Sequence, residues 1–89
     1  MPQAEVEIVN KLGLHARASA KLTQLAGSFL CEVWMERGGR RINAKSIMGV
    51  MMLAAGRGAK VMVITNGEQE NEALQGLLQL IADRFGEAE

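Results

Sequence analysis

Polar and apolar residues alternate at the start of the chain. Over residues 3–9, Val6 and Ile8 fall on one side of an extended segment, with Glu5 and Glu7 on the other. This is the period of a half-buried strand. The next four residues break the pattern, so the chain is expected to open with a strand and then a loop.

Three later segments repeat their apolar residues at helical spacing, and we predict helices over residues 16–26, 47–55 and 69–85. Their core-facing positions are Ala18, Leu22, Leu25 and Ala26 in the first, Val50, Leu53 and Ala54 in the second, and Leu74, Leu77, Leu78, Ile81 and Phe85 in the third. Ser46 suits the N-cap of the second helix. Glycines that suit helix ends are Gly27 after the first helix and Gly56 with Gly58 after the second.

Strand-forming residues fill the segments between these helices. We predict strands over residues 29–35 and 41–44, joined into a hairpin by Gly38 and Gly39, and a buried strand over residues 60–65. The resulting order is β-α-β-β-α-β-α. It favours an α+β fold, a two-layer open-faced β-sandwich in which three helices cover one face of a four-stranded, mostly antiparallel sheet.

Length and composition leave room for one compact domain over residues 1–89. With 48% hydrophobic and 22% charged residues, the chain is typical of a globular protein. The first residues lack the pattern of a secretion signal, and no apolar run is long enough to span a membrane. We therefore expect a cytoplasmic protein without membrane insertion. Cys31, the single cysteine, is expected to be a buried structural thiol.

The net charge is zero, which disfavours non-specific nucleic-acid binding through phosphate neutralisation. The charges are nevertheless unevenly distributed. Acidic residues dominate the last third of the chain, whereas nearly all of the positive charge lies between residues 11 and 60. We therefore expect the middle of the chain to face an acidic partner.

The single histidine, His15, lies where the first loop meets the first predicted helix. Unpaired N–H groups and the positive end of the helix dipole favour an anion there, and the guanidinium of Arg17 suits phosphate oxygens. Imidazole is partly neutral, and then nucleophilic, near neutral pH. From these residues alone two interpretations stay open: a phosphate-carrying histidine, and a histidine that merely caps the helix or stays solvated in a loop.

Two motifs, Gly13-Leu14-His15-Ala16-Arg17 and Lys45-Ser46-Ile47-Met48-Gly49, resemble the phosphohistidine and regulatory-serine regions of the histidine-containing phosphocarrier (HPr) family. They lie at the family's separation, and the resemblance extends over essentially the whole chain. It implies a phosphoryl carrier of the phosphoenolpyruvate-dependent phosphotransferase system, for sugar uptake or its regulation, rather than an enzyme. By this resemblance, His15 accepts a phosphoryl group on Nδ1 from phospho-enzyme I and passes it to an enzyme IIA component, while Arg17 stabilises the phosphoryl oxygens.

Ala18 departs from the family pattern, which usually has proline directly after the arginine. Without proline the unfolded state gains entropy worth about 0.4–1 kcal/mol. Ala18 has the N–H that proline lacks, so we expect Ala16, Arg17 and Ala18 to offer backbone donors to the phosphoryl group. This chemistry requires no metal or cofactor, and a lone histidine offers no metal site.

Ser46 acquires a second role from the resemblance, and that role is compatible with its use as an N-cap. In HPr proteins of many bacteria, the matching serine is phosphorylated by an ATP-dependent HPr kinase/phosphorylase. A phosphate there adds a charge of about −2 at a helix start, beside a surface that meets acidic partners. We therefore expect phosphorylation of Ser46 to slow phosphoryl transfer from enzyme I.

The second predicted helix is apolar almost all round, and its three methionines repeat the helical spacing on a face away from Val50. Such a methionine stripe fits either a core or a surface that adapts to several partners. Because the family docks partners through this helix, the resemblance favours the surface. The expected partner-binding residues are Ile47, Met48, Met51, Met52, Lys21 and Lys45.

Three rivals stand beside the leading hypothesis. One is a carrier of a nitrogen-type regulatory branch without sugar transport, which the identity of the phosphate acceptor distinguishes. Another is a purely regulatory binding protein, although such a protein needs neither His15 nor Arg17. A nucleic-acid-binding domain has little support, because the net charge is zero and the only aromatic residues are Phe29, Trp34 and Phe85. We expect a monomer.

Overall fold

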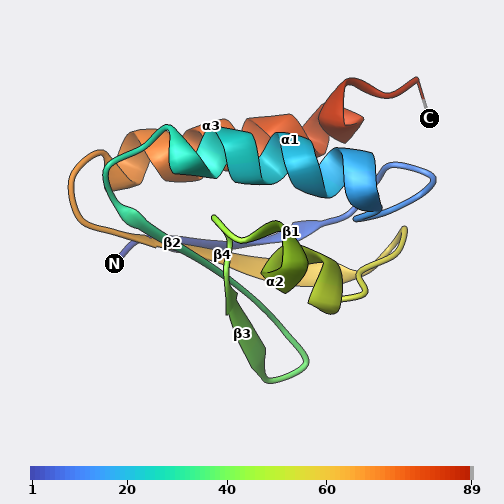
Figure 1. Cartoon of the computed structure of the whole chain (residues 1–89), viewed down its shortest axis with the longest axis horizontal. Helices are drawn as coiled ribbons and strands as arrows, with labels where there is room; N and C mark the ends of the chain where they lie inside the picture. The colour runs from blue at the N-terminus through green and yellow to red at the C-terminus, as the bar shows by residue number, and fades with distance from the viewer. Residues whose placement is uncertain (89) are drawn as a thin grey trace.

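The computed structural model describes residues 1–88 and contains one antiparallel sheet with the strand order β1-β4-β2-β3. The strands are β1 (Gln3–Glu7), β2 (Glu32–Arg37), β3 (Arg40–Asn43) and β4 (Lys60–Asn66). The helices are α1 (Ala16–Gly27), α2 (Ile47–Met52) and α3 (Glu70–Ala82), followed by a short 3-10 turn, η1 (Arg84–Gly86). In Figure 1, α1 and α3 lie side by side over one face of the sheet, with α2 beside the β2–β3 hairpin. The predicted α+β fold and element order are confirmed.

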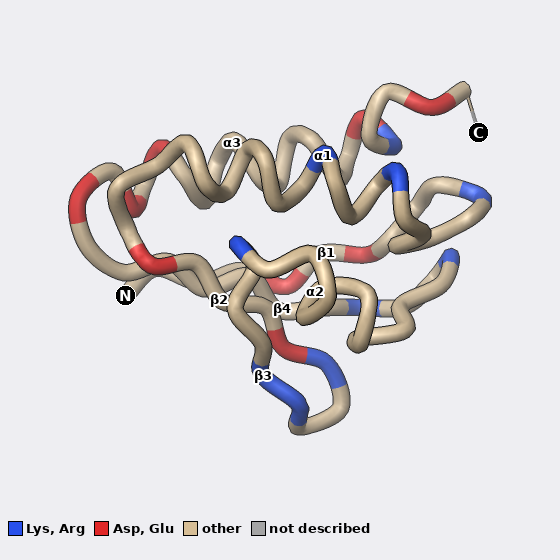
Figure 2. Tube along the Cα trace, viewed as in Figure 1, with Lys and Arg blue, Asp and Glu red and all other residues tan. Residues whose placement is uncertain are grey.

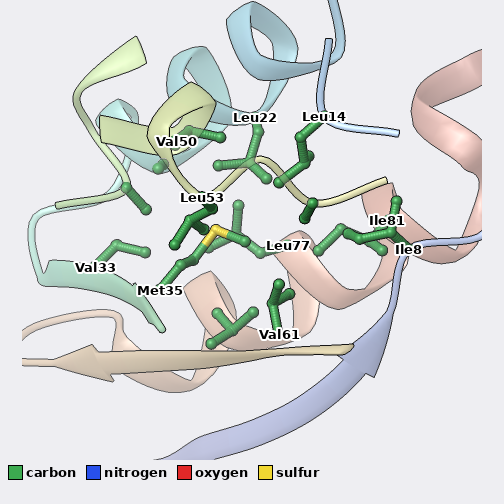
Figure 3. Close-up of a cluster of buried hydrophobic side chains, with 14 of the residues drawn as sticks. Ile8, Leu14, Leu22, Val33, Met35, Val50, Leu53, Val61, Leu77 and Ile81 are labelled. Carbon is green, nitrogen blue, oxygen red and sulfur yellow. The ribbon is translucent and has the colours of Figure 1, made fainter. Parts of the chain in front are cut away.

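One apolar core fills the space between the helices and the sheet. Leu22 of α1, Val50 of α2 and Leu77 of α3 are wholly buried and converge with Met35 and Val61 from the sheet (Figure 3). Burying a side chain of this kind stabilises the fold by roughly 1.5–3 kcal/mol. All three helices are therefore held by the same cluster, which fixes α1 and α2 relative to each other.

Two predictions about single residues are confirmed: the glycine turn of the hairpin and the burial of Cys31. Gly38 and Gly39 have φ values of 58° and 82°, and Arg37 pairs directly with Arg40 across them. A two-residue hairpin turn with positive φ at both positions favours glycine because other residues are strained there. Cys31 is a buried free thiol.

Every predicted strand differs from the structure at one end or both: β3 lies one residue earlier, β4 ends one residue later and β2 ends two residues later than predicted, and two differences are larger or affect the core. The strand expected over residues 29–35 begins only at Glu32, because the chain first bends away from α1, and the Leu30 N–H donates to Gln69 Oε1 (3.0 Å). The first strand ends at Glu7 instead of residue 9. Ile8 is nevertheless wholly buried, so the predicted inward face of this segment is correct.

Two helices are shorter than predicted. α2 ends at Met52 instead of residue 55, because Ala54 adopts a left-handed backbone conformation (φ 51°) and lies exposed rather than in the core. α3 ends at Ala82 instead of residue 85, and the chain turns through two left-handed residues, Arg84 and Phe85. Phe85 is still wholly buried, as its place in the apolar pattern predicted. No helix within residues 1–88 is long and apolar enough to cross a membrane.

Candidate functional site

His15 occupies the N-cap position of α1. Its backbone is extended (φ −75°, ψ 179°), and its imidazole makes no capping hydrogen bond. The Ser19 N–H donates to the His15 carbonyl (2.8 Å), whereas the N–H groups of Ala16, Arg17 and Ala18 have no backbone acceptor among residues 1–88. The N–H groups of the exposed Ala16 and Arg17, at the positive end of a helix dipole, are therefore available to an anion, whereas Ala18 is wholly buried.

A glycine-dependent loop fixes the position of His15. Gly13 has a φ of +66°, and a Cβ at this position would lie only 2.6 Å from the Ala55 carbonyl oxygen. The Leu14 N–H donates to the same oxygen (2.9 Å), and the Leu14 side chain is buried. The Ser19 hydroxyl donates to the Leu14 carbonyl (3.1 Å). The loop before α1 is thus held by the Ala55 carbonyl on one side and by the Ser19 hydroxyl on the other.

The C-terminal segment brings a carboxylate to the imidazole. Glu87 Oε2 lies 2.5 Å from His15 Nε2, and Glu87 Oε1 accepts a hydrogen bond from Asn10 Nδ2 (3.0 Å). Asn10 is wholly buried and also donates to the Gly13 carbonyl (2.9 Å). The side chains of His15 and Glu87 are 27% and 16% exposed. Nε2 is therefore the engaged ring nitrogen, and Nδ1 is left for other chemistry.

Hydrogen bonding lowers the pKa of the Glu87 carboxyl below its ordinary value of 4.5. The main cause is the Asn10 amide, and burial acts in the opposite direction. The bond to His15, the charge of His15 and the charge of Lys21 lower the pKa further. Sequence reasoning did not predict the hydrogen bond between Asn10 and Glu87, because the two residues are 77 positions apart and no periodicity links them.

His15 opens into a cleft of about 750 Å³ formed by the loop before α1, the first turn of α1 and the C-terminal segment. Its lining residues are Lys11, Leu12, His15, Ala16, Arg17, Glu87 and Ala88. Arg17 is exposed and has no hydrogen-bond or ion-pair partner in the described part of the chain. Figure 2 shows several Lys and Arg at this end of the molecule, together with Asp and Glu of the C-terminal segment, and further Asp and Glu where α3 begins. The cleft is suited to an anion.

The predicted methionine face of α2 lies at the surface. Met48 is 67% exposed and Met52 is 55% exposed, and Ile47 and Met51 are exposed as well, whereas Val50 is wholly buried. The helix packs beside α1. The alternative that the methionine stripe belongs to the core is therefore excluded, and a continuous apolar surface lies on the helix next to the one that follows His15.

Side chains form hydrogen bonds with backbone groups at both ends of α2. Ser46 is the N-cap, as predicted, since its hydroxyl accepts a hydrogen bond from the Gly49 N–H (3.2 Å). At the other end, Arg37 and Arg40 each donate from Nη1 to carbonyl groups of the last turn, at 2.9 and 3.2 Å. Sequence reasoning assigned no such role to the hairpin arginines. Their contacts fix the short helix and its exposed face.

The two lysines expected on the partner-binding face both tie chain segments together. Lys21 Nζ donates to the Phe85 carbonyl (2.7 Å), and Lys45 Nζ donates to the Phe29 carbonyl (2.9 Å). Both side chains remain at the surface. Residues 1–88 contain no cluster of three or more His, Cys, Asp or Glu side chains that could hold a metal ion.

A partly exposed histidine at an anion-ready helix start, carried on an α+β open-faced sandwich, fits the class of small histidine phosphocarriers. A family model described as the PTS HPr component phosphorylation site matches residues 2–83. The Phosphocarrier protein HPr of Cupriavidus necator is 64% identical over 89 residues, which is 100% of both chains. That of Pseudomonas aeruginosa is 52% identical over 90 residues and 100% of both chains.

Solved structures agree with these sequence matches. The crystal structure of HPr from Thermoanaerobacter tengcongensis matches with a TM-score of 0.97 and 42% identity over 100% of both chains. HPr from Bacillus anthracis matches with a TM-score of 0.85 and 40% identity, over 88% of this chain and 93% of that one. The chain belongs to the HPr family. It is a phosphocarrier of the phosphotransferase system, a protein that carries a phosphoryl group rather than a catalyst.

Proposed function

We propose that His15 carries the phosphoryl group on Nδ1, accepting it from phospho-enzyme I and passing it to an enzyme IIA component. The observation that supports this most directly is the position of the imidazole at the start of α1. Nε2 is bonded to Glu87, and three unpaired backbone N–H groups follow in the chain. The proposal places this relay in the cytoplasm, with the protein acting as a monomer.

Charge stabilisation is assigned to Arg17 and the helix start. As the Nδ1 lone pair bonds to phosphorus, the bond between phosphorus and the donor breaks, and negative charge is spread over the phosphoryl oxygens. A loose transition state of this kind needs positioning and positive charge more than covalent help. The Arg17 guanidinium and the N–H groups of Ala16, Arg17 and Ala18 supply both. The scheme uses no metal or cofactor.

Partners are proposed to dock on the exposed face of α2 and the neighbouring lysines. Methionine side chains adapt to differently shaped surfaces, which suits a carrier that must meet both a donor and several acceptors. The lysines add positive charge near the docking face, because each ammonium group keeps its charge while it donates to a carbonyl. The residues of this proposed face are Ile47, Met48, Met51, Met52, Lys21 and Lys45.

Ser46 is proposed as a regulatory phosphorylation site for an HPr kinase/phosphorylase. Its hydroxyl is exposed at the start of α2, directly before Ile47 of the proposed docking face. A phosphate there adds roughly −1.5 to −2 charge and three acceptor oxygens. The helix start tolerates that charge, whereas an acidic partner is repelled by it. Transfer from enzyme I is therefore expected to slow when Ser46 is phosphorylated or replaced in Ser46→Asp.

The acceptor protein distinguishes a sugar-uptake carrier from a carrier of a nitrogen-type branch. Both use the same histidine chemistry, so the geometry of the cleft favours neither. Offering the phosphorylated protein to purified enzyme IIA components of each kind, and comparing the initial rates of transfer, separates the two. The faster acceptor identifies the branch.

Labelled phosphoenolpyruvate and enzyme I test the central proposal. The wild-type protein is expected to acquire an acid-labile label, and His15→Ala is expected to acquire none while retaining its circular dichroism spectrum. Arg17→Ala is expected to be labelled more slowly. A protein that stays unlabelled beside an active enzyme I, or a label on another side chain, contradicts the proposal.

A further inference from the structure

We propose that Glu87 is a positioning residue for His15: it holds the imidazole proton on Nε2 and thereby leaves the Nδ1 lone pair free for phosphorus. This inference rests on the proposed function, since it concerns the same histidine. An ionised carboxylate has acceptors but no donor, so the Nε2 atom facing it must carry the proton. The neutral ring then has its lone pair at Nδ1.

Both oxygens of the Glu87 carboxylate are held. Oε2 lies 2.5 Å from His15 Nε2, and Oε1 accepts from Asn10 Nδ2 at 3.0 Å. Because the Asn10 side chain is wholly buried and also donates to the Gly13 carbonyl, the carboxylate is tied to the loop that carries His15. The arrangement therefore restricts the ring orientation as well as the proton position.

The backbone after α3 turns so that the Glu87 carboxylate lies next to His15. Arg84 and Phe85 both have left-handed conformations, with φ values of 56° and 55°, which are costly for residues other than glycine. The turn persists because Phe85 is wholly buried and its carbonyl accepts a hydrogen bond from Lys21 Nζ (2.7 Å). The Glu87 N–H in turn donates to the Arg84 carbonyl (2.9 Å). A strained segment thus carries the carboxylate back to α1.

The role applies in both directions of transfer. When His15 is phosphorylated, Nδ1 gains a bond to phosphorus, the donor recovers the electron pair of its broken bond, and the Nε2 proton stays in place. The ring formally becomes positive, and the adjacent carboxylate offsets this charge. When the phosphoryl group leaves, the electron pair of the Nδ1–P bond returns to Nδ1. A neutral imidazole departs because Nε2 is still protonated.

Ring nitrogen NMR on the unphosphorylated protein tests the proton position. In protein labelled with ¹⁵N-histidine, at a pH where the ring is neutral, the wild type is expected to show only the Nε2–H tautomer. Glu87→Ala is expected to show a mixture of the two tautomers. Glu87→Gln is expected to restore the Nε2–H tautomer only in part, because its amide has one acceptor oxygen for the two donors Asn10 Nδ2 and His15 Nε2. Asp83→Asn is the matched control, since Asp83 lies in the same segment but bonds to Gln79.

Transfer kinetics supply the second readout. Glu87→Ala is expected to slow the single-turnover transfer from phospho-enzyme I by roughly threefold to tenfold, the factor that one ordinary hydrogen bond supplies. Asp83→Asn is expected to leave the rate unchanged. Unaltered ring shifts together with an unaltered rate in a folded Glu87→Ala overturn the inference.

The NMR readout also separates this inference from the proposed function. If the wild-type protein takes no label on His15, the proposed function fails, but the tautomer measurement still tests Glu87. A pure Nε2–H tautomer in the wild type and a mixture in Glu87→Ala support the positioning role in either case. A shift that appears in Asp83→Asn as well points to a general charge effect and contradicts the role.

Discussion

The starts of α1 and α2 are built differently although the two helices pack side by side. Both follow a residue with an extended backbone, His15 before α1 and Ser46 before α2. Ser46 satisfies its helix by accepting from the Gly49 N–H, whereas His15 makes no capping bond. The first helix start is left open to an anion and the second is closed by its own side chain. The difference separates a start suited to binding from one suited to stability.

Contacts outside the helix compensate for the missing cap of α1. Leu14 is anchored through its N–H on the Ala55 carbonyl, and Ser19 bonds back to the Leu14 carbonyl. Ala18 and Leu22 are wholly buried in the core. Packing therefore maintains an open helix start that local sequence alone would leave weak.

The largest expected effect comes from giving α1 a cap like that of α2. His15→Ser is expected to abolish labelling by phospho-enzyme I completely, because the nucleophile is lost. It is also expected to be about 1 kcal/mol more stable than His15→Ala, since serine accepts a hydrogen bond at an N-cap and alanine cannot. Urea unfolding of the two variants measures the difference. Equal stabilities would show that the open start of α1 cannot be closed in this way.

Gly13→Ala is expected to disturb the loop that holds the start of α1 in place. It places a Cβ 2.6 Å from the Ala55 carbonyl oxygen at a φ of +66°, so a loss of at least about 2 kcal/mol in unfolding free energy is expected. Gly38→Ala is the control, with a φ of +58° and nothing within 4 Å of the added Cβ. It is expected to cost only about 1–2 kcal/mol. A smaller loss for Gly13→Ala than for Gly38→Ala contradicts the proposed support.

The fold could be predicted from periodicity because core packing decides it. Leu22, Val50 and Leu77 were found from helical spacing, and all three are wholly buried. Boundaries failed where the backbone conformation of one residue decides the end of a helix. Ala54 ends α2 in a left-handed conformation, and Phe85 reaches the core only after the helix has broken. Side-chain patterns carry no signal for either event.

Sequence reasoning likewise found one part of the candidate site and missed another. His15 and Ser46 were found because a helix start is a local feature that a few neighbouring residues define. Glu87 was not found, because it meets His15 across 72 positions and only through the path the chain takes after α3. The hairpin arginines that cap the end of α2 were missed for the same reason. Local motifs identify the histidine, and long-range geometry supplies its environment.

Ser46→Ala tests the side-chain cap at the start of α2. The Gly49 N–H loses its acceptor, so the unfolding free energy is expected to fall by about 1 kcal/mol, with an unchanged dependence on urea concentration. Ser46→Asp provides the control, because a carboxylate caps a helix and favours its positive end. It is expected to stay near wild-type stability. Equal losses in both variants would argue against capping.

Ala18→Pro tests whether the open start of α1 is used. Its N–H has no backbone acceptor within residues 1–88, and helical φ suits proline, so a gain of roughly 0.4–1 kcal/mol in unfolding free energy is expected. The substitution also removes the N–H expected to bind the phosphoryl group. A shorter phosphohistidine lifetime or a slower transfer is therefore expected. If the stability rises while lifetime and transfer rate stay the same, the Ala18 N–H is not a donor to the phosphoryl group.

The smallest expected effect is the pH dependence of the link between the C-terminal segment and the start of α1. Because the pKa of Glu87 is lowered in the folded protein, its carboxylate contributes stability above the ordinary pKa of 4.5. That contribution is lost as the pH falls through the lowered value. The stability difference between wild type and Glu87→Gln is therefore expected to shrink as the pH is lowered below 4.5. Thermal unfolding at a series of pH values measures it, and a difference that persists unchanged in acid means that the Glu87 charge does not hold the segment in place.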